Sequence, residues 1–369
     1  MEHKPLKEIA QITMGQSPES SSYNSEQDGL PFFQGNSDFG EMYPVERIWC
    51  NDPKKVAHPG DILISVRAPI GALNYAQKEC CIGRGLAAIT VKDEAERNYI
   101  FHLLKARNDD LNSKGTGSTF KAIGKSILED LLIPVISHDE QVYSMKLMDL
   151  TESIIRCRRT ELGWLDNLIK ARFVEMFGDE KHIMQMSQVC SIITDGTHQP
   201  PKFVSDGIPF IFVSNITGNK VTYDADKYID QRTYDELIKR TPIEIGDVLL
   251  STVGSYGHPA VVKTNKKFLF QRHIAYLKPR KEIIDSDFLH GAILSPAGQR
   301  QIEDGVKGIA QKTLNLSEIK KMTIPVPDLI KQKAFATFVT QVNKTKSAIQ
   351  KSLDETQLLF DSLMQQYFG

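Results

Sequence analysis

Residues 140–178 read EQVYSMKLMDLTESIIRCRRTELGWLDNLIKARFVEMFG and predict one long helix near the middle of the chain. Apolar side chains recur there at alternating steps of three and four residues, which is the a/d pattern of a helix packed along a partner helix. Polar side chains occupy three of the same positions. The resulting seam, about four heptads long, is Met148, Thr151, Ile155, Arg158, Leu162, Leu165, Ile169, Arg172 and Met176.

The same pattern returns at the end of the sequence. Phe177-Gly178 reappears as Phe368-Gly369, a separation of 368 − 177 = 191 residues. We therefore expect a second long helix in the same register that packs on the first as an intramolecular coiled coil; dimerisation through the first helix is the alternative. Charged seam residues weaken such a pairing but can fix its register. Adding 191 to the first seam gives Val339, Lys346, Ile349, Leu353, Phe360, Leu363 and Tyr367.

Length and composition restrict the class of protein. A chain of 369 residues predicts at least two domains, and 41% apolar with 25% charged residues is typical of a soluble globular protein. We expect no membrane span, because no apolar run approaches the ~20 residues required, and MEHKPLKEIA is not a signal peptide. Five cysteines without a CxxC pair favour small buried thiols in a reduced cytoplasm over disulfides or zinc. The net charge of −1 excludes a uniformly basic surface but not local basic patches.

A first unit is expected over residues 1–137. LKEIAQI near its start predicts a short helix, and a longer helix is predicted from about Arg97 to Leu111. A loop rich in Gly, Ser and Thr then leads to LLIPVISHDEQ, where Ser137 or Asp139 can cap the long helix. Strands are predicted at 30–33, 61–66, 72–76 and 86–91.

A second unit, over residues 179–328, repeats the plan of the first. The offset between matching residues grows from 206 − 28 = 178 to 246 − 60 = 186 and then to 325 − 134 = 191, so the second copy carries insertions in its loops. The matches include Asp28-Gly29 with Asp206-Gly207, GDILIS at 60–65 with GDVLLS at 246–251, Arg84 with Arg272, Lys121 with Lys312, and Pro134 with Pro325.

The loops between these matched positions differ. GQSPESSSYNSEQ at 15–27 stands against TDGTHQPPKFVS at 194–205, and SVRAPIG at 65–71 against STVGSYG at 251–257. A shared frame with unlike loops is expected of two recognition modules that read different targets. Drift of surface loops after a duplication is the alternative.

Motifs for catalysis are weak. The sequence contains neither a GxxxxGK[ST] phosphate loop nor HExxH spacing among its nine histidines, and Gly115 and Gly117 lack the remainder of a dinucleotide fingerprint. Gln199-Pro200-Pro201-Lys202 differs from the Asn/Asp-Pro-Pro-aromatic loop of amino-methyltransferases at both its first and last positions. We expect no catalytic residue, metal site or cofactor site in this chain.

The loop residues suit nucleic acid better. Arg can form a forked contact with guanine, Asn and Gln with adenine, and Lys neutralises phosphate. The matched pairs Arg84/Arg272 and Lys121/Lys312 can equally be kept by internal salt bridges or loop-capping hydrogen bonds. The candidate DNA-binding residues are Ser17, Asn36, Arg67, Arg84 and Lys121 in the first unit, and Thr194, His198, Asn215, Tyr256, Arg272, His273 and Lys312 in the second.

Taken in this order, and occurring twice, these features resemble the specificity subunit of type I restriction–modification enzymes. The most specific part is the exit of each unit into its long helix, LLIPVISHDEQ at 131–141 and MTIPVPDLIKQ at 322–332. The starts of the units, LKEIAQITMGQSP at 6–18 and MSQVCSIITDGTH at 186–198, and the GDxLxS turn are also similar to that family. The second start lacks the GQSP form, so the two targets should differ.

The resemblance implies an α+β fold with two similar target-recognition domains of mixed α/β structure, at 1–137 and 179–328. Each would read one half of a bipartite site in double-stranded DNA. Antiparallel spacer helices at 138–178 and 329–369 would separate them, and ~37 helical residues span roughly 55 Å, against ~34–36 Å for a turn of DNA.

The resemblance also implies that the chain itself is not an enzyme. Two methyltransferase subunits that bind S-adenosylmethionine would dock on it and flip an adenine from each half-site, with or without restriction (motor) subunits that use ATP and Mg²⁺. The location implied is the cytoplasm of a prokaryote. Two further hypotheses stay open at this point: a catalytic remnant, and a protein-binding scaffold with duplicated domains and no DNA contact.

Overall fold

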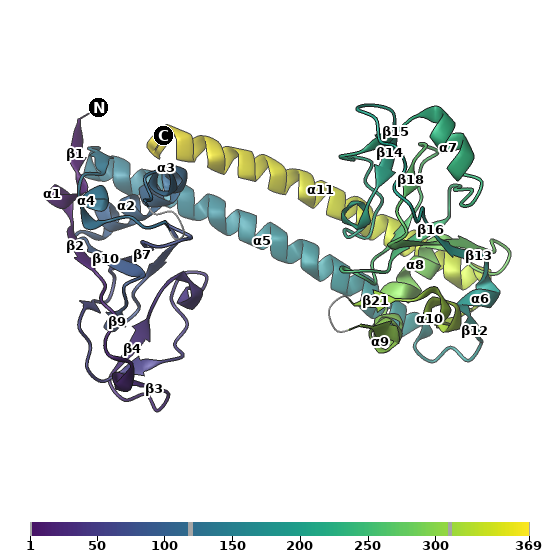
Figure 1. Cartoon of the computed structure of the whole chain (residues 1–369), viewed down its shortest axis with the longest axis horizontal. Coiled ribbons are helices and arrows are strands. Elements are labelled where there is room, and N and C mark those ends of the chain that lie inside the picture. Colours follow the sequence, from purple (N-terminus) through teal and green to yellow (C-terminus); the bar gives the residue numbers. More distant parts are fainter. Residues whose placement is uncertain (1, 117–120, 309–311, 369) are drawn as a thin grey trace. The chain divides into compact units, whose positions relative to one another are not determined.

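The computed structural model describes residues 2–116, 121–308 and 312–368 and divides the chain into two compact units. Unit 1 comprises residues 1–158 and 352–369, and unit 2 comprises residues 159–351 (Figure 1). Each unit therefore contains one copy of the repeat together with parts of both long helices. Within the described residues, none of the helices is long and apolar enough to cross a membrane.

Both units are built on a four-stranded antiparallel sheet with the same strand order. In unit 1 the order is β2-β10-β7-β8, and in unit 2 it is β13-β19-β16-β17. The internal repeat is thus present in the topology as well as in the sequence. The strands are β2 Gln11–Met14, β7 Ile62–Ser65, β8 Leu73–Tyr75 and β10 Leu86–Thr90, matched by β13 Cys190–Asp195, β16 Val248–Ser251, β17 Pro259–Val261 and β19 Ile274–Pro279.

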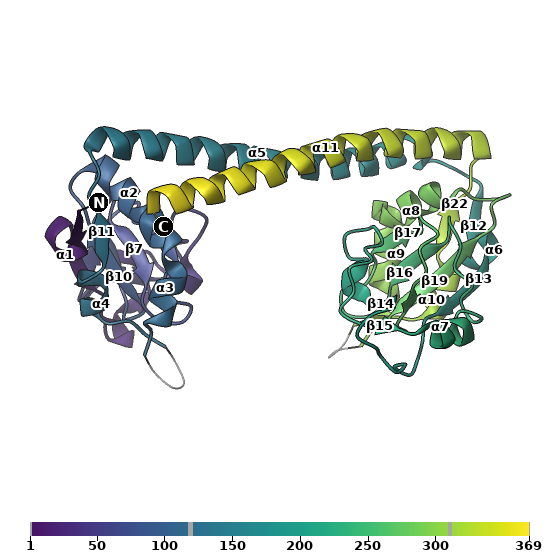
Figure 2. The same ribbon diagram turned by 90° about the horizontal axis from the view of Figure 1, so that it is seen from above.

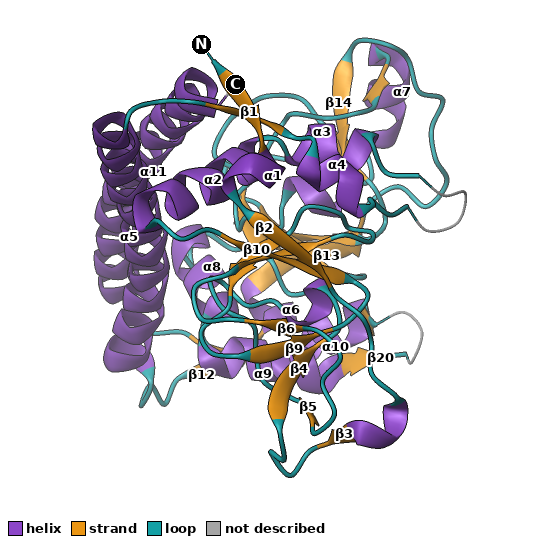
Figure 3. Ribbon diagram, turned by 90° about the vertical axis from the view of Figure 1, so that its left-hand side faces the viewer, coloured by secondary structure: helices purple, strands orange, loops and turns teal. Residues whose placement is uncertain are grey.

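Smaller elements are repeated around these sheets. Each unit has a two-stranded antiparallel pair, β1-β11 or β12-β22, and a parallel pair, β4-β9 or β14-β18. Figure 3 shows α1 and α4 near β2 in unit 1, and Figure 2 shows α8 next to β17 in unit 2. In unit 1 these elements are β1 His3–Pro5, α1 Leu6–Ile9, η1 Ser20–Ser22, β3 Tyr23–Asn24, β4 Leu30–Phe33, η2 Asn36–Asp38, β5 Trp49–Cys50, β6 Val56–Ala57, β9 Cys80–Ile82, α4 Lys125–Glu129 and β11 Leu132–Pro134. In unit 2 they are β12 Ile183–Gln185, α6 Met186–Val189, β14 Ile208–Ile211, η3 Val213–Asn215, β15 Tyr228–Ile229, α7 Gln231–Leu237, β18 Leu269–Phe270, α8 Ser286–Leu294, α9 Pro296–Gly305, β20 Val306–Lys307, β21 Thr313–Leu314, α10 Leu316–Lys321 and β22 Thr323–Pro325.

Helix α7 accounts for part of the growing offset between the copies. It lies between β15 and β16, within residues 212–247. The corresponding residues 34–61 of unit 1 form η2 and the short strands β5 and β6. The two units therefore share a central sheet but carry different peripheral structure.

The repeated GDxLxS motif has a structural explanation. Gly60 and Gly246 have φ of +88° and +97°, in the left-handed region that favours glycine. The following carboxylates, Asp61 and Asp247, are buried and accept the backbone N–H of residues three positions earlier, at 2.8 and 2.7 Å. The apolar residues of β7 and β16 are almost fully buried, as in a strand covered on both faces.

The helix predicted from Arg97 to Leu111 differs in the structure. It begins earlier and divides into α2, Glu94–Ala106, and α3, Asn108–Ser113. The N-cap is Asp93, whose side chain accepts the N–H of Glu96, a capping signal that the prediction missed. The cysteines also need a correction, because Cys157 is exposed while the other four are buried.

The predicted central helix forms as the 40-residue helix α5, His138–Phe177, and the predicted C-terminal helix as the 40-residue helix α11, Leu329–Phe368. Of the two candidate caps of α5, Ser137 is the one used, since its hydroxyl accepts from Glu140 N and donates to the Glu140 carboxylate. In unit 2 the helices run antiparallel in contact: Phe173 packs against Phe335, with ring centroids 5.3 Å apart. The seam residue Lys346 pairs with Asp166.

The repeated Phe-Gly ends of the long helices pack into the two cores. Phe177 contacts Phe288 of α8, with ring centroids 4.9 Å apart. Phe368 contacts Tyr99 of α2 at 5.1 Å and stacks on His102. Burial lowers the pKa of His102, so this ring is neutral at neutral pH. Each long helix thus ends by filling the core of one unit.

These two phenylalanines give a test of the packing. Phe177→Ala or Phe368→Ala should each lower the free energy of unfolding by about 3–5 kcal/mol, because a buried ring is replaced by a cavity. Urea denaturation of the full chain measures this loss. Leu358→Ala on α11 is the matched control, since Leu358 is 72% exposed and should change stability by less than ~0.5 kcal/mol. Equal effects of Phe368→Ala and Leu358→Ala would contradict the packing described.

Candidate nucleic-acid interface

Four of the five predicted site residues of unit 1 lie on four segments at one end of the central sheet. The first loop follows β2, and its Gly15 lies so close to the loop at Gly83 that a Cβ would stand 2.2 Å from the Gly83 carbonyl oxygen. Only glycine permits this approach. The second loop then continues to Arg84, whose backbone N–H donates to Ser17 Oγ at 3.2 Å.

Two further segments, residues 66–68 and 121–123, join the same cluster. Val66 N donates to the Gly85 carbonyl at 2.9 Å, and Ala68 N donates to the Lys121 carbonyl at 3.1 Å. The structure therefore brings Ser17, Arg67, Arg84 and Lys121 onto adjacent loops. We call these segments, residues 15–17, 66–68, 83–85 and 121–123, loop cluster 1.

Unit 2 repeats these contacts almost bond for bond. Gly196 approaches the Phe270 carbonyl as Gly15 approaches that of Gly83, and Arg272 N donates to the Thr197 carbonyl at 3.1 Å. Thr252 N donates to the His273 carbonyl at 2.9 Å, and Gly254 N donates to the Lys312 carbonyl at 3.3 Å. We call residues 196–198, 252–254, 271–273 and 312–314 loop cluster 2.

The arginine and lysine side chains of these clusters face solvent. Arg67, Arg84 and Lys121 are exposed, as are Arg272 and Lys312. The contacts that the structure describes for the matched pairs Arg84/Arg272 and Lys121/Lys312 come from their backbones. Each loop cluster therefore presents basic side chains on a frame held by the main chain.

His273 differs from these basic residues. It is half-buried, and burial together with the neighbouring Arg272 lowers the pKa of its imidazole. His273 is therefore neutral at neutral pH and offers one donor and one acceptor rather than a charge.

The remaining predicted residues lie elsewhere. Asn215 is buried in η3, where its amide accepts from Phe212 N at 2.9 Å and donates to the Asp224 carbonyl at 2.7 Å, so in this structure it holds the turn. Asn36 begins η2 in the peripheral part of unit 1 and is half-buried. Thr194 lies in β13 opposite Tyr276, and Tyr256 packs on the core of unit 2; both are half-buried.

Two residues beside loop cluster 2 escaped the sequence prediction. Asp195 accepts from Arg240 Nη2 at 2.5 Å through Oδ1 and contacts His198 Nε2 at 2.9 Å through Oδ2. Arg240 and the loop 196–202 border a hollow of about 500 Å³. Arg240 follows the inserted helix α7, so comparison of the repeats offered no signal for it. The sequence Asp195-Gly196-Thr197-His198 contains two of the three residues, but nothing in it indicates that Arg240 would contact them.

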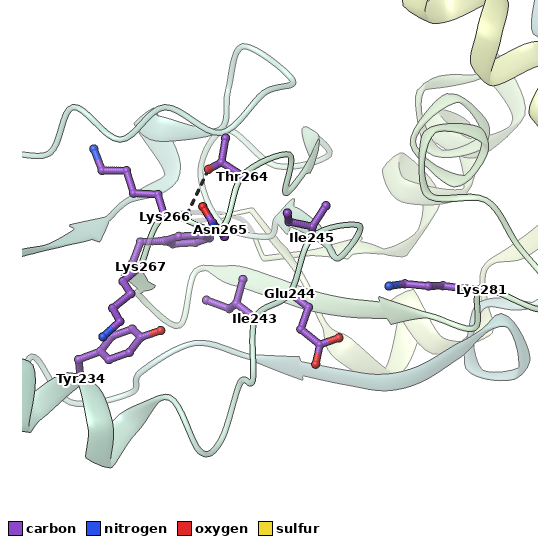
Figure 4. Close-up of a pocket in the computed structure, with 10 residues that line it drawn as sticks. Tyr234, Ile243, Glu244, Ile245, Thr264, Asn265, Lys266, Lys267 and Lys281 are labelled. Atoms are coloured by element: carbon purple, nitrogen blue, oxygen red, sulfur yellow. Dashed lines mark hydrogen bonds between the residues drawn. The ribbon is translucent and has the colours of Figure 1, made fainter.

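A second hollow of unit 2, about 360 Å³, is drawn in Figure 4. It is lined by Lys266, Lys267 and Lys281, and the first two ammonium groups lie over the rings of Tyr223 and Tyr234 at 5.2 and 5.4 Å. Residues 264–267 follow β17, whereas the segment 252–254 of loop cluster 2 lies between β16 and β17. This hollow therefore lies toward the opposite end of the sheet.

Comparison with known proteins assigns the family. The family model described as "type I restriction modification DNA specificity domain" matches twice, over residues 1–161 and 180–356. The chain belongs to this family. The two matched segments coincide with the two copies of the repeat.

Relatives within the specificity-domain family are distant or partial. A putative type I restriction enzyme MjaX specificity subunit of Methanocaldococcus jannaschii is 43% identical over 151 residues, which is 41% of this chain and only 36% of that protein. The EcoBI specificity subunit of Escherichia coli is 22% identical over 97% of this chain and 82% of its own length. The S subunit of a type I restriction–modification system from M. genitalium shares the fold, with a TM-score of 0.58, 14% identity, and coverage of 100% of this chain and 96% of that one.

Proposed function

We propose that this specificity-domain protein is the non-catalytic, sequence-specific DNA-binding subunit of a type I restriction–modification system. Loop cluster 1 reads one half of a bipartite target and loop cluster 2 reads the other. The observation that carries the proposal is the duplicated main-chain frame, which presents the matched pairs Arg84/Arg272 and Lys121/Lys312 beside unlike residues such as Ser17 and His198. The family match supports the same conclusion.

The loop clusters supply two kinds of contact. Exposed arginines such as Arg84 and Arg272 can form forked contacts with base edges in the major groove. Lys121 and Lys312, one in each cluster, suit phosphate contacts that position the reader without reading sequence. Because Ser17 of cluster 1 stands where His198 stands in cluster 2, the two half-sites should differ.

The long helices act in this proposal as a spacer and a docking surface. Target-recognition domains at 1–137 and 179–328 would be separated by α5 and α11 paired as an intramolecular coiled coil. The outer faces carry apolar side chains such as Leu150, Trp164 and Leu358, which are 58–72% exposed and suited to partner subunits. Two methyltransferase subunits would bring S-adenosylmethionine, and restriction subunits, where present, would bring ATP and Mg²⁺.

Domain exchange tests the bipartite reading. Replacing residues 1–137 with the matching domain of another specificity subunit should change one half of the methylated site and leave the other half unchanged. Methylome sequencing of cells that express the chimaera with its methyltransferase subunit measures this. A change in both halves would contradict modular reading, and the absence of any methylated site for the parent chain with its methyltransferase would favour the protein-binding scaffold.

Salt dependence tests the phosphate role of the matched lysines. Lys121→Ala or Lys312→Ala should weaken binding to all DNA sequences alike and reduce the slope of log K against log salt by about 0.9, since one phosphate contact is lost. Fluorescence titration of the methyltransferase complex at several salt concentrations gives the slope. Lys92→Ala, at the other end of β10, is the control and should leave it unchanged. An unaltered slope in both test variants would exclude this role.

A further inference from the structure

Asp195 joins two side chains that lie far apart in the sequence. It ends β13 and is 17% exposed, whereas Arg240 and His198 are about half exposed. One carboxylate oxygen contacts Arg240 and the other contacts His198, so the carboxylate group cannot rotate freely. The outward parts of the guanidinium and the imidazole face the hollow beside loop cluster 2.

The distances determine where the protons lie. His198 Nε2 is 2.9 Å from Asp195 Oδ2 and 3.2 Å from Arg240 Nη2. If Nε2 instead accepted a hydrogen bond from Arg240, it would carry a lone pair and no proton. No hydrogen bond would then join Nε2 to the carboxylate oxygen that lies only 2.9 Å away. Nε2–H therefore donates to Asp195, and the ring directs Nδ1 away from the carboxylate. Both partners thus hold the carboxylate by donated hydrogen bonds.

Arg240 differs from the arginines of the loop clusters in its electrostatic setting, because a carboxylate contacts its guanidinium. Asp195 neutralises the charge of Arg240, which reduces its attraction for a phosphate at any position. What remains is a set of N–H donors held in one orientation. A fixed fork of donors suits the paired acceptors O6 and N7 of guanine, where geometry rather than charge decides the contact.

The arrangement belongs to unit 2. Asp195 pairs with Ala275 across the sheet, and the residue in the same position of unit 1 is Met14, which pairs with Ala87. Arg240 follows α7, where unit 1 has β5 and β6 instead. A contact made by Arg240 would therefore distinguish the second half-site from the first.

Building on the DNA-binding function proposed above, we propose that Asp195 is a positioning residue that holds Arg240 toward the acceptor edge of a guanine in the half-site read by unit 2. Arg240 is then a specificity-determining residue of that reader. His198 holds the second carboxylate oxygen and keeps the orientation fixed.

The first test is Arg240→Ala in the full chain with its methyltransferase subunits. The probe is a duplex that carries the site methylated by the wild-type complex, with each base pair of the second half-site changed in turn. Discrimination at one G·C pair should fall about 5- to 150-fold, while the first half-site and the salt slope stay unchanged. Arg232→Ala, at an exposed arginine of the preceding helix α7, is the matched control and should leave discrimination unchanged.

The second test is Asp195→Asn, which frees Arg240 from its countercharge. Discrimination at the same G·C pair should fall, while affinity for random duplex rises and the salt slope steepens by about 0.9. A merely structural role for Asp195 would not strengthen random binding. Thermal melting shows whether Asp195→Asn is folded. If it is not, the result for Arg240→Ala alone decides whether Arg240 reads the G·C pair.

The contrary outcomes are distinct. Arg240→Ala that weakens every sequence equally and lowers the salt slope would make Arg240 a phosphate contact and overturn the inference. Unchanged discrimination in Arg240→Ala would overturn it as well, with the proposed function intact. A wild-type complex that prefers no bipartite site would overturn both.

Discussion

The rest of the structure depends on the main-chain hydrogen bonds that tie four segments together at one end of each central sheet. Gly15 and Gly196 allow the loops to touch, and bonds such as Ala68 N to Lys121 O and Gly254 N to Lys312 O close them. Because backbone atoms make these contacts, the side chains of the same residues are free to differ. A duplicated frame can therefore carry two different recognition surfaces without loss of the fold.

The long helices impose a second constraint. Each core is completed by a phenylalanine at the end of a helix, Phe368 for unit 1 and Phe177 for unit 2. Unit 1 therefore includes residues 352–369 as well as 1–158. A residue pair separated by 191 positions in sequence thus has one packing role in both units, which explains why the Phe-Gly ending is repeated.

Much of this could be predicted from the sequence where a pattern was local and occurred twice. The strands at 30–33 and 61–66 follow from apolar runs, and the cap of α5 was narrowed to Ser137 or Asp139, of which Ser137 is used. The division of α2 and α3 was missed because its apolar stripe continues past the break. Asn215 looked like a base reader by residue type, but its amide is used inside the fold. Arg240 could not be found, since only the folded chain brings it to Asp195.

In the proposed function, the paired helices set the distance between two independent readers. The most direct measurement is methylome sequencing after one heptad, seven residues, is removed from each of α5 and α11, with both seams kept in register. Each helix shortens by about 10 Å, so the non-specific spacer of the methylated site should shorten by about three base pairs, at ~3.4 Å each. Both half-sites should stay the same. An unchanged spacer, or a changed half-site, would contradict the account.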